Sequence, residues 1–193
     1  PAGNYYFEVF DNRKQCSAVG SVTLKQPDPM QVTVAVTNVT CHGAATGKLE
    51  VTDVQGGDGA YTYKWYENQG GTPVLISEQT LAQGLSADVD YTLEVADGSG
   101  NVDQLNFKLT QPKNPLQVSV DTYQSQTEVT CKGDKDAFVR IIATGGTADY
   151  TYQWDDPTLT IDPVETNKAK DLGVGRYTVL VQDANGCTAP FGF

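Results

Sequence analysis

Apolar and polar residues alternate along many short stretches of the chain, and this alternation predicts β-strands with one buried face. It is plain in QVTVAV (31–36), where every second residue is a valine. Similar stretches occur in matching pairs, at 31–36 and 116–120, 48–54 and 137–143, 60–66 and 149–154, and 91–97 and 177–183. A last strand is expected at 105–110, and no stretch has a convincing helical period. Short strands separated by turn residues predict an all-β fold of antiparallel sandwiches, immunoglobulin-like or fibronectin-III-like.

The paired stretches belong to a longer repeat. GGDGAYTYKW (56–65) returns as GGTADYTYQW (145–154), with both glycines, both tyrosines and the tryptophan in place. DYTLEVAD (90–97) returns as RYTVLVQD (176–183), and NYYFEVFD (4–11) is a third version. The repeat divides the chain into three parts: the C-terminal part of a first module (1–27), a complete second module (28–112) and a nearly complete third module (113–193). Since the chain begins and ends inside modules, we expect it to be an excerpt from a longer array.

We expect the modules to lie end to end. Their joints are rich in proline, with QPDP at 26–29 and QPKNP at 111–115. Proline restricts φ and favours an extended conformation in the residue before it, so short joints of this kind are stiff. The sequence therefore predicts an extended rod.

The charge of the chain limits its partners. The formal net charge is −11. Nucleic acid requires a basic patch, and anionic membranes recruit Lys and Arg, so neither is an expected partner. No apolar run reaches the roughly 20 residues that span a bilayer, so we expect no membrane span in this fragment. The composition suits an extracellular array at a cell surface.

The aromatic residues of the repeated motif lie on one face of the predicted third strand, because side chains at every second position point the same way. They are Tyr61, Tyr63 and Trp65 in the second module, and Tyr150, Tyr152 and Trp154 in the third. A core position is the favoured interpretation, since immunoglobulin-like sandwiches bury a tryptophan on their third strand. The alternative is an exposed platform on which sugars stack. The paired glycines before each strand supply a turn with positive φ or a close backbone approach.

The repeat contains the motifs VTC-x-G, GG-x-x-x-YTY-x-W, G-x-YT-x-x-V-x-DANGC and QP, in this order. In combination they resemble the SprB repeat of gliding-motility adhesins in the Bacteroidota. The second module departs from the pattern, because it reads ADGSGNV (96–102) and lacks a cysteine near Val102. The resemblance implies a very large, repetitive cell-surface filament, exported by the type IX secretion system and carried along the outer membrane during gliding. It implies no catalytic residue.

Candidate catalytic residues are few. His42 is the only histidine and follows Cys41, but adjacent residues on a strand point to opposite faces, and the third module has Lys132 in its place. Four cysteines without CxxC spacing do not predict a zinc site. We therefore expect no enzyme and no cofactor other than calcium.

Calcium is the one metal that the sequence suggests. DGSGNVD (97–103) places Asp97, Asn101 and Asp103 at alternate positions, as at the start of a calcium loop. The stretch lacks the later bidentate glutamate of an EF-hand. A plain hairpin turn between the last two strands explains the same residues without a metal.

Three functions are distinguished. The leading interpretation is a structural spacer in an adhesive surface filament, whose partners are neighbouring repeats, a surface polysaccharide or substratum, and, through other parts of the parent protein, outer-membrane gliding and secretion machinery. The second is a carbohydrate-binding module of a secreted polysaccharide-degrading enzyme. The third, a catalytic domain, is disfavoured because a catalytic site is seldom repeated in consecutive modules.

The pairing of the cysteines depends on topology. In an immunoglobulin-like sandwich, the loop after the first strand and the turn between the last two strands lie at opposite ends. Cys131 and Cys187 are therefore separated by a module length, whereas a disulfide tolerates only about 7 Å between Cα atoms. The first loop of one module faces the last turn of the next, which predicts a Cys41–Cys187 bridge across the joint. Cys16 and Cys131 are then expected to pair with modules outside this chain.

Overall fold

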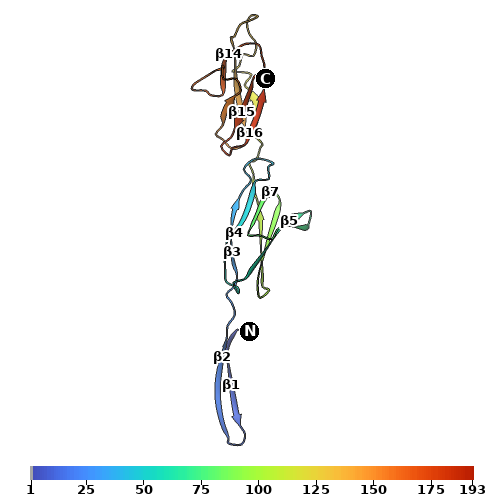
Figure 1. Ribbon diagram of the computed structural model, residues 1–193, viewed down its shortest axis with the longest axis vertical. Coiled ribbons are helices and arrows are strands. Elements are labelled where there is room, and N and C mark those ends of the chain that lie inside the picture. The colour runs from blue at the N-terminus through green and yellow to red at the C-terminus, as the bar shows by residue number, and fades with distance from the viewer. Residues whose placement is uncertain (1) are drawn as a thin grey trace.

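The computed structural model describes residues 2–193, and over this range the chain consists of strands and loops, without a helix. Figure 1 shows an N-terminal hairpin and two sandwiches arranged end to end along the long axis of the molecule. The strands of both sandwiches run roughly along this axis. All strand pairings are antiparallel, which confirms the predicted all-β class.

The N-terminal part is a hairpin of β1 (Gly3–Asp11) and β2 (Cys16–Leu24), paired from Gly3–Leu24 to Asp11–Cys16. Large apolar side chains are exposed on it, including Phe7 and Val9. The corresponding residues of the second module, Leu93 and Val95, are fully buried. The hairpin therefore has the sequence of two core strands but lies outside a sandwich.

The second module is a sandwich of seven strands: β3 (Gln31–Thr37), β4 (Gly47–Gln55), β5 (Tyr61–Gln69), β6 (Thr72–Ser77), β7 (Leu81–Leu85), β8 (Asp90–Asp97) and β9 (Val102–Lys108). They form the sheets β3-β4-β7 and β6-β5-β8-β9. Alternate residues of both sheets meet in one core, whose fully buried members include Leu49, Trp65 and Leu93. The period-two pattern thus places its apolar face inward. The last strand ends at Lys108, two residues before the predicted end.

The third module repeats this plan with β10 (Gln117–Val120), β11 (Ala137–Thr144), β12 (Thr151–Trp154), β13 (Thr160–Ile161), β14 (Lys168–Leu172), β15 (Thr178–Gln182) and β16 (Thr188–Gly192). Its sheets are β10-β11-β14-β13 and β12-β15-β16, the four-plus-three arrangement of constant-type immunoglobulin domains. A separate core forms around Val139, Ile141 and Val181.

The two modules differ in where the fourth strand pairs. In the second module β5 continues into Gly70 and Gly71, both at positive φ, and the chain turns back so that β6 pairs with β5. Glycine suits such a two-residue hairpin turn. In the third module β12 stops before Pro157, which has no N–H, and the Asp156 carboxylate accepts the Thr158 N–H at 2.8 Å. The chain then crosses to the other sheet, where β13 pairs with β14.

Each module also has a tyrosine corner at the start of its sixth strand. The Tyr91 hydroxyl donates to the Ser86 carbonyl at 3.1 Å, and the Tyr177 hydroxyl donates to the Gly173 carbonyl at 3.0 Å. This bond ties the strand to the preceding connection, as in immunoglobulin domains.

Candidate functional site: the joint between the second and third modules

The paired glycines before the third strand hold the linker in place. Gly145 and Gly146 have φ values of 73° and 57°, a region that favours glycine. The Gly146 N–H donates to the Asn114 carbonyl at 2.9 Å, and a Cβ at Gly145 would collide with the Pro115 carbonyl oxygen. The Tyr150 hydroxyl donates to the Gly145 carbonyl at 2.7 Å. The repeated GG and tyrosine motif is therefore a fastening between linker and sandwich.

The aspartate of the DANGC motif organises the turn beside these glycines. Asp183 is only 4% exposed. Its Oδ1 accepts the N–H groups of Asn185 at 2.9 Å and Cys187 at 2.8 Å, and its Oδ2 accepts the Thr147 N–H at 2.9 Å. A buried carboxylate needs such donors. One side chain thus fixes both the turn that carries the cysteine and the turn that carries the glycines.

A disulfide crosses the joint at this turn. Cys41, from the loop between β3 and β4, is bonded to Cys187, and their Cα atoms lie 5.7 Å apart. Next to it, the Asn185 side-chain amide donates to the Thr40 carbonyl at 3.1 Å and to Thr147 Oγ1 at 3.0 Å. The structure therefore has the cross-module pairing that the strand order predicts.

The loop that presents Cys41 is held by the end of its own module. The Gly43 N–H donates to Gln111 Oε1 at 2.6 Å, and the His42 ring contacts the Pro112 carbonyl oxygen through Nδ1 at 2.9 Å. His42 is thus engaged with the linker, and the Cys41 sulfur is in the disulfide. This arrangement gives the Cys–His pair a structural role.

The loop at Cys131 has the same backbone design. The Cys131 carbonyl accepts the Asp134 N–H at 3.1 Å, as the Cys41 carbonyl accepts the Ala44 N–H at 3.0 Å. The Thr130 hydroxyl donates to Asp136, and this hydrogen bond lowers the pKa of the Asp136 carboxyl. In the part of the chain that the structure describes, Cys131 and Cys16 are exposed and carry free thiols.

The turn at 97–101 is the counterpart of the disulfide turn, and it shows what replaces the cysteine. Asp97 Oδ1 accepts the N–H groups of Ser99 and Asn101, two and four residues on, in the pattern that Asp183 makes with Asn185 and Cys187. Asn101, rather than Val102, therefore stands in the place of Cys187. The missing cysteine lies one residue earlier than the sequence pattern suggests, because the two turns have the same length.

The calcium candidates lie in this turn. Asp97 is 6% exposed, and the Asn101 side-chain amide donates to its Oδ2 at 2.8 Å. This hydrogen bond, followed by backbone N–H bonds, lowers the pKa of the Asp97 carboxyl. Asp103 accepts the Gln104 N–H at 3.0 Å. Among residues 2–193 there is no group of three or more His, Cys, Asp or Glu side chains that could hold a metal. Calcium at Asp97, Asn101 and Asp103 stays a prediction.

The six aromatic residues of the repeated motif pack into the cores. Trp65 is fully buried and its Nε1 donates to the Gln79 carbonyl at 2.9 Å. Trp154 is half-buried and donates to the Thr166 carbonyl at 3.1 Å. It is less covered because β12 is an edge strand, whereas β5 has neighbours on both sides. The four tyrosines are partly buried against the same cores: Tyr61, Tyr63, Tyr150 and Tyr152.

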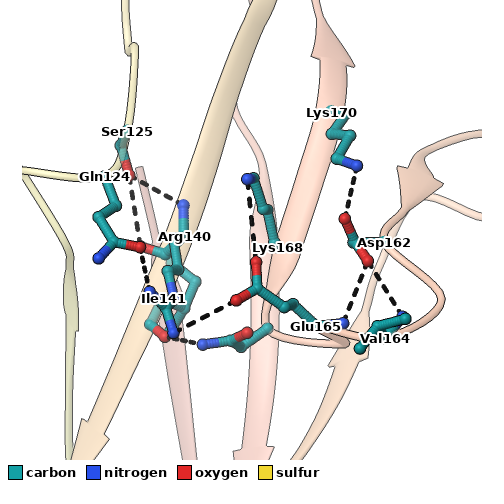
Figure 2. A network of polar contacts seen from close by, with 10 residues as sticks. Gln124, Ser125, Arg140, Ile141, Asp162, Val164, Glu165, Lys168 and Lys170 are labelled. Atoms are coloured by element: carbon teal, nitrogen blue, oxygen red, sulfur yellow. Dashed lines mark hydrogen bonds and ion pairs between the residues drawn. The ribbon is translucent and has the colours of Figure 1, made fainter.

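A polar network covers part of the sheet β10-β11-β14-β13 (Figure 2). Glu165 lies between Arg140, at 3.5 Å, and Lys168, at 3.8 Å. Lys170 is paired with Asp162, whose Oδ1 also accepts the Val164 N–H at 3.0 Å. The Lys170 bond, then the backbone N–H groups, hold the pKa of the Asp162 carboxyl far below its usual range. Each carboxylate has a cation partner, so the network closes the β13–β14 hairpin.

Sequence reasoning missed the residues that support the disulfide. Asp183, Asn185 and Gln111 have no catalytic pattern and would pass as ordinary turn and linker residues. The available signal was the repetition of an aspartate at the same place in both turns, at Asp97 and Asp183. A buried acid that recurs without a basic neighbour in sequence indicates a carboxylate that accepts backbone N–H groups.

Comparison with protein families now bears on this joint. Residues 33–70 and 124–159 match the family model of the SprB repeat. Two segments of this chain are SprB repeats. The matched segments lie at corresponding places in the second and third modules, each from the loop-forming first part of the sandwich to the third strand or just beyond it. The SprB repeats place the chain among the structural repeats of cell-surface adhesins.

Solved structures similar to this chain are those of adhesion proteins. The C-terminal 282-residue fragment of intimin, in complex with the intimin-binding domain of the translocated intimin receptor, is 14% identical with a TM-score of 0.43, over 84% of this chain and 63% of that one. The N-terminal eight Ig domains of Down syndrome cell adhesion molecule are 13% identical with a TM-score of 0.39, over 91% and 26%. The chain thus spans less than two thirds of either structure.

Two comparisons are negative. No curated protein matches the chain. Within residues 2–193, none of the secondary structure is a helix of the length and apolarity that a bilayer requires.

Proposed function

We propose that this chain is a non-catalytic spacer of a large bacterial cell-surface filament that resembles the gliding-motility adhesin SprB. The observation that carries the proposal is the disulfide across the joint of two sandwiches arranged end to end. A spacer must keep its length and direction when it is pulled, and a covalent bond between successive modules serves this purpose. In such a filament the chain lies outside the cell, and other parts of the parent protein attach to the outer membrane and its secretion machinery.

The position of the bridge routes tension past both cores. A force applied to the two chain ends passes along the residues before Cys41, crosses the sulfur atoms, and leaves along the residues after Cys187. β3 leads toward Cys41, and β16 follows Cys187. The sequence separation of 146 residues between the cysteines stays outside the loaded path. The bulk of both sandwiches is therefore protected from extension.

Single-molecule pulling between the chain ends tests the proposal. Fully extended chain spans about 3.3–3.6 Å per residue, so reduction of the bridge should add roughly 500 Å to the final unfolded length. A Cys41→Ser variant should behave like the reduced protein under oxidising conditions. If the oxidised protein also released the longer length, the bridge would not bear the load and the spacer proposal would lose its support.

Further modules extend the same design. We propose that Cys131 bonds to the last turn of a following module, and that Cys16 bonds to the first loop of a preceding one. Cys16 lies opposite Asp11 in the hairpin register, as Cys187 lies opposite Asp183. The loop at Cys131 has the backbone of the loop at Cys41. These partners are neighbouring repeats of the same kind.

The carbohydrate-binding alternative needs exposed aromatic side chains in a groove. Trp65 is inaccessible and Trp154 packs edge-on against Phe193, with ring centroids 6.2 Å apart. A glycan-binding screen of the whole chain separates the two functions. Specific binding abolished by Trp154→Ala, with Trp65→Phe as a matched control, would favour the carbohydrate-binding module.

A further inference from the structure

The third module is open at the end that lies opposite the joint. A cavity of about 480 Å³ lies beside Phe193, the last residue of the chain. Its apolar lining comes from both sheets and consists of Val129, Ala137, Val139, Leu172, Tyr177 and Phe193. An apolar cavity between two sheets exposes core surface to water, which is unfavourable.

The second module has the same six positions, but there they surround a leucine. Leu172 pairs with Ala137 as Leu85 pairs with Gly47, and Phe193 lies opposite Tyr177 as Phe107 lies opposite Tyr91. In the second module the chain continues past Phe107 to Leu109, which is fully buried. Leu109 contacts the backbone position of Gly47 so closely that a Cβ there would collide with its Cδ1.

The burial of the lining residues differs as this comparison requires. Val39 is 3% exposed and Tyr91 is 2% exposed, each covered in the closed second module. Their counterparts Val129 and Tyr177 are only half-buried. The cavity of the third module is therefore the site that Leu109 fills in the second.

We propose that this cavity is the binding site for the leucine of an L-x-Q-P segment that extends β16. The chain contains two such segments, LKQP (24–27) and LTQP (109–112), each directly after the last strand of a module. The partner is thus a peptide strand with a leucine two residues beyond the residue opposite the corner tyrosine. The methyl group of Ala137 replaces a hydrogen of Gly47, and the leucine accommodates it by turning its δ-methyl groups.

Polar groups around the cavity match the rest of the segment. In the second module the Val39 N–H donates to the Thr110 carbonyl at 2.9 Å, and the Gly43 N–H donates to Gln111 Oε1 at 2.6 Å. The equivalent N–H groups of Val129 and Gly133 have no protein partner within residues 2–193. An L-x-Q-P segment supplies a backbone carbonyl to the first and a glutamine side chain to the second. It would thereby order the loop that carries Cys131.

An extended chain tests the inference. The sequence Lys-Leu-Thr-Gln-Pro is added after Phe193, and hydrogen exchange at 127–137 and 176–182 is compared with that of the original chain. Burying one leucine should slow exchange in these segments by about ten- to hundredfold and raise the melting temperature of the third module. The matched control carries alanine in place of the added leucine and should leave exchange near that of the original chain.

Two results would overturn the inference. Equal protection by the leucine and alanine extensions would mean that added backbone, and not the cavity, is responsible. Unchanged exchange at 127–137 with the leucine extension would mean that the segment does not enter the cavity. Neither result depends on the filament role, because the pulling experiment concerns the Cys41–Cys187 bridge alone.

Discussion

At the residue scale, glycines and aspartates decide where one part of the molecule fastens to another. Gly145 allows the linker to pass against the sandwich because it has no side chain, and Asp183 provides acceptors for backbone N–H groups at the disulfide turn. Both act through geometry and hydrogen bonds. Their substitution should therefore affect folding and the joint.

Gly145→Ala should destabilise the third module more than Gly133→Ala. Both glycines have positive φ, which costs about 1–2 kcal/mol for any other residue. Only at Gly145 does the new Cβ collide with a backbone atom, the Pro115 carbonyl oxygen, whereas it has open space at Gly133. Chemical denaturation measures both free energies of unfolding. Equal losses would show that the linker yields without strain.

Asp162→Asn should reduce the pH dependence of stability in the acidic range. The folded pKa of Asp162 is depressed below its reference of 3.8, so its contribution is present above that pH and is lost as the pH falls toward the folded value. The variant should therefore be less stable than the parent at pH 6, and the two should converge below about pH 3. Urea midpoints across this range check the prediction, and a constant difference would contradict it.

Calcium at Asp97, Asn101 and Asp103 has a direct test. A ligand that binds only the folded state stabilises it by about 2.7 kcal/mol when its concentration is 100 times the dissociation constant. A real site should therefore raise the melting temperature in millimolar calcium. Identical melting in calcium and in chelator would return the segment to a plain hairpin turn.

At the element scale, the two modules show how one turn selects the sheet to which a strand belongs. β6 stays beside β5 because Gly70 and Gly71 form a tight turn, while Asp156 and Pro157 end β12 and send the chain to β14. The strand preceding each turn carries the same Y-T-Y-x-W motif. Residues outside the repeated motif therefore decide the topology.

Replacing Gly70 and Gly71 with alanine should loosen β6 selectively. Each substitution places a residue other than glycine at positive φ, with a cost of about 1–2 kcal/mol. Amide exchange over Thr72–Ser77 should accelerate while β8 stays protected. Gly59→Ala is the matched control, since Gly59 also has positive φ and open space but lies outside this turn. Acceleration of β6 by the control would sink the assignment.

At the scale of the whole molecule, the disulfide sets how the two sandwiches are joined. Without it, the joint retains the linker and the hydrogen bonds from Asn185 to Thr40 and from His42 to Pro112. Exposed hydrogen bonds of this kind contribute only about 0.5–1.5 kcal/mol each. They are weak fixings for two bodies of this size.

Cys41→Ser with Cys187→Ser should therefore uncouple the motions of the modules. NMR relaxation should give each module a shorter rotational correlation time in the double variant than in the oxidised parent. Cys131→Ser is the control, because Cys131 lies away from this joint with a free thiol. Unchanged correlation times would mean that the linker alone holds the joint.

Much of the fold could be predicted from local pattern. The strands at 31–36, 48–54 and 91–97 appear where apolar residues alternate, because side-chain direction in a strand depends only on neighbouring residues. The fourth and fifth strands, β6 and β7, were not located. β6 has mostly exposed residues and β7 is short, so neither carries a clear periodic signal.

The sequence by itself determined the repeat, the all-β class, the end-to-end order and the aromatic stripe, since each depends on spacing along the chain. With one assumption about sandwich ends, it also predicted which cysteines lie near each other. Only the tertiary structure decided that β13 joins the other sheet, that Asn101 stands in the place of Cys187, and that the site of Leu109 is open beside Phe193. These facts depend on contacts between segments that are distant in sequence, where a free strand edge or an unfilled space selects the partner.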